Sequence, residues 1–125
     1  MNTEQVAQKV ADLCRRGAWM EAVNTFYDKD IVSLEARASN GESPEKRGLD
    51  QVRGKTEWWL DNMQMHSVKV GGPFVGHDRF VLQYDIDVTD KASKKRMQIS
   101  EVGVYTVKNG KIGREEFLPL TGGKS

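Results

Sequence analysis

Cysteine, proline and histidine are scarce in this chain of 125 residues, which has one cysteine, three prolines and two histidines. A single cysteine, Cys14, cannot form a disulfide within the chain, and a reducing, cytoplasmic location is the expectation. The N-terminal residues lack the basic flank and the apolar core of a secretion signal. No window approaches 18 consecutive apolar residues, so the sequence predicts no membrane-spanning helix.

Charge of one sign is also missing. The 19 basic and 18 acidic residues give a formal net charge of +1, and both signs are scattered along the chain. Proteins that bind nucleic acid or an anionic membrane surface usually gather positive charge into a patch, so neither partner is expected. Two histidines and one cysteine, without a cluster at ligand spacing, predict no metal site.

Helical periodicity is present in the first half of the chain. Apolar residues at three-and-four spacing predict a first helix that has Thr3 as its N-cap and stops at Gly17. A short second helix is predicted over residues 19–26 and a longer third one over residues 49–63. Residues 37–48 are polar and predict a long loop, of the kind that often closes over a binding site.

From Met65 onward the period changes to two, which is typical of strands. Residues 79–90 alternate cleanly, and two further strands flank Asn109-Gly110, a strong hairpin signal. An earlier apolar run, DIVSLEA at residues 30–36, predicts the first strand. This order predicts an α+β fold in which N-terminal helices pack in a curved antiparallel sheet, as a single domain over residues 1–125.

The order of elements, together with three strings, resembles the nuclear transport factor 2-like superfamily, which includes SnoaL-like polyketide cyclases, ketosteroid isomerases and limonene epoxide hydrolases. The strings are FYDKDIVSLEA, RGLDQVRGKTEWWLDNM and GVYTVKNGKI, and the resemblance covers nearly the whole chain. It implies a cone-shaped fold with a deep small-molecule pocket between the concave face of the sheet and the helices. It also implies a homodimer that forms through the outer face of the sheet.

Glu35, by this resemblance, falls where ketosteroid isomerases keep their carboxylate base. A carboxylate among apolar neighbours would have its pKa raised by desolvation and could act near neutral pH. The alternative is that Glu35, close to the end of its strand, points to water or pairs with an arginine such as Arg37 or Arg47. Glu35 is therefore predicted as the base, with this structural role left open.

The other catalytic groups of these relatives do not carry over. Val10 and Gly103 occupy the positions of the oxyanion-stabilising pair of the isomerases. Phe117 aligns with the final-strand aspartate of the epoxide hydrolases. Neither steroid isomerase nor epoxide hydrolase activity is expected.

Glu101 is the second predicted catalytic carboxylate. A four-residue loop at residues 91–94 places it opposite Tyr84 on the inward face of the sheet. The Tyr84 hydroxyl could then donate a hydrogen bond to Glu101, and either side chain could orient a ligand or donate a proton to it. A purely structural carboxylate, satisfied by a tyrosine or a backbone amide, is the alternative.

Only one of Glu115 and Glu116 can face inward, because side chains alternate along a strand. A strict two-residue turn at residues 109–110 selects Glu116. The resemblance selects Glu115, and a bulge in the strand would reconcile the two arguments. Glu115 is therefore the predicted pocket residue, with surface positions for both glutamates as the alternative.

Aromatic side chains and one histidine complete the predicted pocket lining. Trp59, Tyr105 and Phe117 lie at helical or alternate-strand spacing, which fits either the pocket or the core. His66 shares strand parity with Val68 and Val70, so its imidazole would shuttle protons if it faces the pocket. A lone histidine on an apolar face is more often a core residue.

These residues together predict a SnoaL-like protein that binds a compact, largely apolar organic molecule without a cofactor. Glu35 would be the base, and Glu101 and Tyr84 would orient the ligand or donate a proton during isomerisation, cyclisation, dehydration or hydrolysis. The alternative is a non-catalytic ligand-binding or dimerisation module, because a fold does not fix a function.

Overall fold

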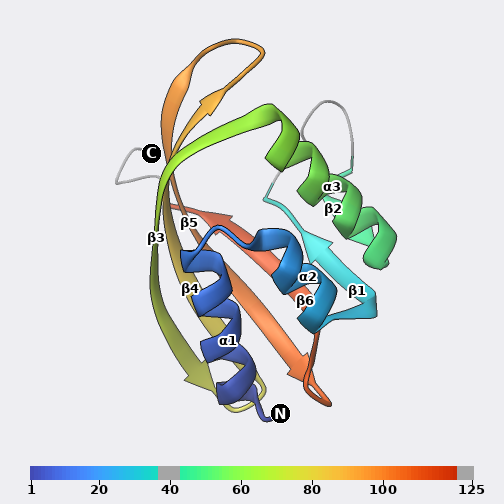
Figure 1. Ribbon diagram of the computed structural model, residues 1–125. Helices are drawn as coiled ribbons and strands as arrows, with labels where there is room; N and C mark the ends of the chain where they lie inside the picture. Colours follow the sequence, from blue (N-terminus) through green and yellow to red (C-terminus); the bar gives the residue numbers. More distant parts are fainter. Residues whose placement is uncertain (37–42, 121–125) are drawn as a thin grey trace.

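The computed structural model describes residues 1–36 and 43–120, which form three helices and one six-stranded sheet (Figure 1). The sheet curves around the helices, so that α1 lies against β3 and β4, and α2 and α3 lie against β1 (Figure 1). None of the helices in these two ranges is long and apolar enough to cross a membrane. The bounds of the elements are α1 (Thr3–Arg15), α2 (Trp19–Phe26), β1 (Tyr27–Leu34), β2 (Glu45–Arg47), α3 (Leu49–Asn62), β3 (Met63–Gly76), β4 (Arg79–Asp90), β5 (Arg96–Lys108) and β6 (Lys111–Pro119).

The strands follow the spatial order β2-β1-β6-β5-β4-β3. Strands β3 to β6 form an antiparallel meander, and β2 pairs antiparallel with β1. The first and last strands, β1 and β6, run parallel, so the sheet is mixed rather than wholly antiparallel as the sequence predicts. The α+β class and the curved sheet are confirmed.

The N-cap of helix α1 lies one residue earlier than predicted. Asn2, not Thr3, is the N-cap, because its side chain accepts from the Gln5 amide while the Gln5 side chain accepts from the Asn2 amide. Gly17 ends the helix as predicted, with φ +72° and its amide donating to the Cys14 carbonyl at 3.0 Å. A residue with a Cβ rarely adopts this left-handed conformation, which explains the glycine.

Strand β2 lies within the segment that the sequence predicts as a loop. Glu45–Arg47 pairs with the end of β1, with Arg47 opposite Val32. The strand is only three residues long, and its polar side chains lack the apolar alternation by which strands are recognised. Residues 37–42 of the predicted loop lie outside the described residues, so a lid over the pocket stays a prediction.

The hairpin between β5 and β6 decides which glutamate faces inward. Asn109 and Gly110 both have positive φ, at 53° and 75°, as a two-residue hairpin turn of the mirror-image type requires. Pairing then steps over Gly113, which is the extra residue of a bulge. The bulge places Glu115 on the inner face opposite Tyr105 and sends Glu116 outward, as the resemblance predicts.

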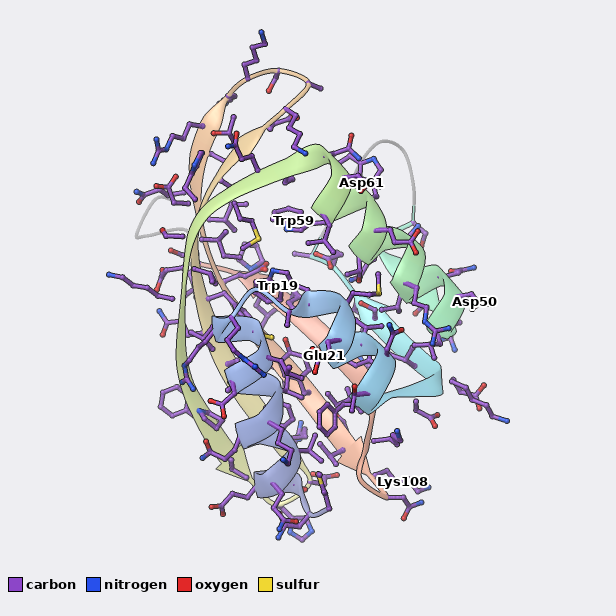
Figure 2. The ribbon with its side chains drawn as sticks, viewed as in Figure 1. Trp19, Glu21, Asp50, Trp59, Asp61 and Lys108 are labelled. Carbon is purple, nitrogen blue, oxygen red and sulfur yellow. The ribbon has the colours of Figure 1, made fainter. Side chains whose placement is uncertain are left out.

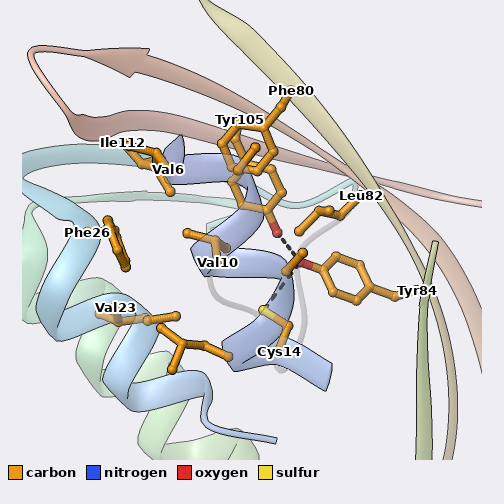
Figure 3. Packing of buried hydrophobic residues seen from close by; sticks show 14 of the residues in the cluster. Val6, Val10, Cys14, Val23, Phe26, Phe80, Leu82, Tyr84, Tyr105 and Ile112 are labelled. Atoms are coloured by element: carbon orange, nitrogen blue, oxygen red, sulfur yellow. Dashed lines mark hydrogen bonds between the residues drawn. The ribbon is translucent and has the colours of Figure 1, made fainter. Parts of the chain in front are cut away.

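The core lies between α1, α2 and the inner faces of the central strands (Figure 3). The Tyr105 ring stacks on Phe80 with 4.8 Å between centroids. The same ring lies directly over Gly103, where an added Cβ would come within 2.8 Å of it. The fully buried large side chains include Val6, Val10, Ile31, Val52, Phe80, Leu82, Val88, Tyr105 and Ile112.

Candidate functional site

Lys55 of α3 is the centre of a polar network on the inner face of the sheet. Its ammonium group donates to Ser33 Oγ at 2.6 Å and to Glu35 Oε2 at 2.8 Å, and it lies 3.5 Å from Glu115 Oε2. The nitrogen also lies 5.1 Å from the centroid of the Phe117 ring. Sequence reasoning missed Lys55, because a lysine on a helix is normally solvated and carries no signal of a buried partner.

Glu115 is a buried carboxylate, with a relative exposure of 1%. It accepts hydrogen bonds from the Tyr27 hydroxyl and from Ser33 Oγ, the latter at 2.6 Å. Burial, reinforced by the charge of Glu115, raises the pKa of Tyr27 well above its usual value, so Tyr27 remains a neutral donor. These donors and the Lys55 cation offset the cost of burying the charge. Glu115 therefore faces inward as predicted, but its oxygens already have partners.

Glu35 lies at the mouth of the same network. It follows the last residue of β1, and its side chain is 40% exposed and ion-paired with Lys55. The apolar surroundings that the sequence predicts for Glu35 are wrong, because Glu35 lies beyond the end of β1 and its contacts on this face are the polar Ser33 and Lys55 network. The alternative prediction is exposure to water or an ion pair with an arginine such as Arg37 or Arg47, and the structure shows partial exposure together with an ion pair to a lysine. The partner is Lys55, whereas Arg47 pairs with Glu45 and Arg37 lies outside the described residues.

Glu101 lies opposite Tyr84 in the β4–β5 register and is partly buried on the inner face, as predicted. Within residues 1–36 and 43–120 its carboxyl group has no hydrogen bond and no ion pair. The pKa of Glu101 is raised to about 7, chiefly by desolvation; the charges of Glu35 and Glu115 contribute to the increase, and that of Lys55 opposes it. Glu101 can therefore both accept and donate a proton near neutral pH.

Tyr84 does not donate to Glu101, so this predicted hydrogen bond is wrong. The Tyr84 hydroxyl lies 2.5 Å from the Tyr105 hydroxyl and 3.7 Å from Cys14 Sγ, deep in the core (Figure 3). Burial raises the pKa of both tyrosines well above the usual value, and it raises that of Cys14 to about 12. The three groups form a neutral chain whose members satisfy one another, and a catalytic role for Tyr84 stays a prediction.

His66 does not share the inward face of Val68 and Val70. A bulge between Met65 and Ser67 makes His66 the unpaired residue of β3. Its Nε2 lies 2.7 Å from Thr89 Oγ1, and its side chain is exposed. The strand parity predicted for His66 is therefore wrong, although the residue still lines an open groove beside Trp19.

Trp59 and Phe117 lie on the inner side of the sheet, where the sequence predicts the lining of the pocket or the core. Both are partly buried and pack against the core, and Trp59 projects from α3 toward β3 (Figure 2). Phe117 faces inward opposite Gly103 and lies below the Lys55 ammonium group. The two rings therefore border the region that contains Lys55 and Glu101, although their contact with a ligand remains a prediction.

An open groove with a volume of about 520 Å³ lies between the end of α1, the end of α3 and the start of β3. The ring of Trp19 lines it, with Nε1 3.3 Å from Met65 Sδ and the ring centroid 5.8 Å from that of Tyr84. Figure 2 shows Trp19 between α1 and α2, in front of the sheet. Trp19 therefore lines the groove and contacts Tyr84, which lies opposite Glu101 in the sheet.

A profile of the SnoaL-like domain matches residues 1–118. The chain belongs to the SnoaL-like family. A solved structure from Mesorhizobium loti, described as a candidate SnoaL-like polyketide cyclase or carbohydrate phosphatase, has 37% sequence identity to this chain and a TM-score of 0.87. The match covers 94% of this chain and 99% of that one. A search of curated proteins finds no significant match.

More distant structures share the fold of this SnoaL-like protein. A nuclear transport factor 2-like protein of unknown function from Burkholderia pseudomallei is 16% identical with a TM-score of 0.76, over 98% of this chain and 93% of that one. TerC, crystallised with polyporic acid, is 15% identical with a TM-score of 0.75, over 95% and 92% of the two chains. The cone-shaped fold and the superfamily predicted from the sequence are confirmed.

Proposed function

We propose that this SnoaL-like protein is an enzyme that binds a compact, largely apolar organic molecule and transfers a proton through Glu101, in a reaction that needs no cofactor. The proposal is based on the burial, the lack of a partner within residues 1–36 and 43–120, and the pKa of Glu101. Glu101 carries a partly buried carboxyl group, unpaired within the described residues, whose pKa is raised to about 7. General acid/base catalysis is most effective when the pKa of the catalytic group lies near the working pH.

The neighbouring charges maintain this balance. When Glu101 accepts a proton it becomes neutral, and the negative charges of Glu35 and Glu115 favour that form. The Lys55 cation favours the ionised form, and it therefore favours transfer of the proton from neutral Glu101 back to the substrate or to solvent. In this mechanism Glu35, which the sequence predicts as the base, acts on Glu101 through charge while it holds Lys55. Isomerisation, cyclisation, dehydration and hydrolysis all include a proton transfer of this kind.

A chromogenic substrate for proton abstraction, 5-nitrobenzisoxazole, tests the proposal. A carboxylate removes the proton from its C3 atom, the electron pair of the C3–H bond completes the C≡N bond of a nitrile, and the N–O bond breaks with its electron pair left on the phenolate oxygen of the product. We expect the protein to accelerate this reaction with an apparent pKa near 7, and the Glu101→Gln variant to lose at least ten-fold in rate.

The matched control is Glu116→Gln, which removes a glutamate that is exposed on the outer face of the same sheet. This variant should retain the rate of the original protein. Equal rates for the Glu101→Gln variant and the original protein would contradict the proposed role of Glu101.

A non-catalytic ligand-binding module is the second candidate function. It is favoured by the packed inner end of the cone, where Tyr84 and Tyr105 are each only 2% exposed, and by the open shape of the groove. A module of this kind would bind small apolar molecules and leave 5-nitrobenzisoxazole unchanged. The probe reaction therefore separates the two functions.

We also propose a homodimer through the outer face of the sheet. Val81, Val102, Val104 and Leu118 share this face by strand register, and Leu118 is 45% exposed. Phe74, paired with Val81, adds a further exposed ring. A contiguous exposed apolar surface of this kind often marks an interface, and a second copy of the chain would cover it.

A further inference from the structure

We propose that the groove beside Trp19 binds the anionic end of the ligand, so that the substrate of this protein is an organic acid with an apolar body. The inference rests on the proposed function, because it concerns the molecule that reaches Glu101. It is carried by the charge of the groove rim, the chemistry of its floor and the position of the groove on the sheet.

The rim of the groove is positive. Arg15 and Arg16 both line it, and none of its lining residues in the described part of the chain is acidic. The Arg15 guanidinium donates to the Val70 and Gly72 carbonyls, the latter at 2.9 Å, and pairs with Asp12 at 3.4 Å. Arg15 therefore holds the second irregularity of β3, between Gly71 and Phe74, in place.

Arg16 differs from its neighbour. Its Nε donates weakly to the Asp12 carbonyl at 3.4 Å, and its two terminal amino groups have no partner within residues 1–36 and 43–120. A guanidinium with two free amino groups can bind a carboxylate through two parallel hydrogen bonds. Arg16 is therefore the arginine at this rim that is available to an anion, and the polar residues His66 and Ser67 line the same groove.

The floor of the groove is apolar. Trp19, Leu60, Met63, Met65 and Val68 line it, and these side chains offer one aromatic face and two flexible thioethers. Its volume of about 520 Å³ falls within the range of small-molecule sites. A carboxylate at the rim and an apolar body on the floor would satisfy both surfaces at once.

The groove also lies within reach of Glu101. Val68 pairs with Ile86, which pairs with Ile99, and Glu101 is the next inward residue of that strand. Neighbouring strands are about 4.8 Å apart and alternate residues of one strand about 6.8 Å, so the floor at Val68 is roughly 12 Å from Glu101. A ligand whose anionic end lies at Arg16 and whose body crosses the floor must extend about this far beyond Val68 for its other end to approach the carboxyl group.

Binding of naphthalene-2-carboxylate and of its neutral isostere, naphthalene-2-carboxamide, tests the inference. The indole N–H signal of Trp19, assigned with a Trp19→Phe variant, reports binding in the groove. We expect this signal to shift and the Kd of the carboxylate to be at least ten-fold lower than that of the amide. The Arg16→Gln variant should bring the two Kd values within two-fold. Arg79→Gln, which removes an exposed arginine outside the groove, should leave the preference unchanged.

Equal affinity for the two probes overturns the inference, and so does an unchanged preference for the carboxylate in the Arg16→Gln variant. Binding that leaves the Trp19 indole signal unshifted, or no binding at millimolar concentration, overturns it as well. The Glu101→Gln variant separates this inference from the proposed function, because it should keep the preference for the carboxylate. Loss of the anion preference with a Glu101-dependent probe reaction would contradict only the groove. An anion preference without that reaction would contradict only the proposed catalysis.

Discussion

Replacement of Glu101 by glutamine should make the fold more stable at high pH. The pKa of Glu101 is about 7 in the folded protein and close to its ordinary value of 4.5 in the unfolded chain. Below pH 4.5 both states hold the proton, and the carboxyl group contributes no difference. Between pH 4.5 and 7 the unfolded chain releases its proton first, so the stability of the original protein falls as pH rises.

The size of the effect follows from the same two values. The gap between about 7 and 4.5 corresponds to an upper limit of roughly 3 kcal/mol above pH 7. Because Glu101 is only partly buried, solvent screening reduces this to about 2 kcal/mol. At pH 8 the Glu101→Gln variant should therefore be more stable by about 2 kcal/mol, and at pH 4 the two proteins should differ by less than about 0.5 kcal/mol.

Urea unfolding at pH 4, 6 and 8 measures this difference directly. Glu116→Gln is the control, and its stability relative to the original protein should be nearly independent of pH. A Glu101→Gln variant that is no more stable than the original protein at pH 8 would refute the reasoning, because its carboxylate would then be either solvated or well paired.

Three further predictions concern the core, the buried network and the outer face. Gly103→Ala places a methyl group within 2.8 Å of the packed Tyr105 ring and should lower the free energy of unfolding, measured in urea, by about 2 kcal/mol. Gly54→Ala, at a helical position with open space, should instead raise it by about 0.5–1 kcal/mol. Equal effects of these two alanines would contradict the close approach of the ring. Glu115→Gln leaves buried donors and the Lys55 cation without their charged partner and should cost about 3 kcal/mol, measured in the same way; a loss below about 0.5 kcal/mol would disprove the network. Sedimentation of the original protein should give about twice the chain mass of 14.1 kDa, and Leu118→Lys on the outer face should lower it to that of one chain. A monomeric original protein would remove the dimer.

Most of the fold could be predicted because its signals are local. Amphipathic spacing marks α1 and α2, alternation marks β4, and Asn109-Gly110 marks the β5–β6 turn. Strand β2 and the parallel contact of β1 with β6 could not be predicted from periodicity. Both depend on pairing between segments far apart in the chain, and β2 is three polar residues without alternation.

The site was predicted less well, because single residues at bulges and strand ends decide it. Alternation places Glu101 correctly, and the resemblance places Glu115 correctly because the bulge at Gly113 shifts the register by one. A second bulge turns His66 away from the face that strict alternation assigns to it. Lys55 was missed because its partners come from β1 and β6, and no spacing within α3 reports them.

Titration of the Glu101 side-chain carbon signal by NMR measures directly whether this carboxyl group exchanges a proton near neutral pH, as the proposed function requires. The signal is assigned by its loss in the Glu101→Gln variant. We predict a midpoint near pH 7, set chiefly by desolvation with a smaller upward contribution from the charge of Glu35. A midpoint at or below pH 4.5 would show that Glu101 is solvated or paired, and would contradict its role in catalysis.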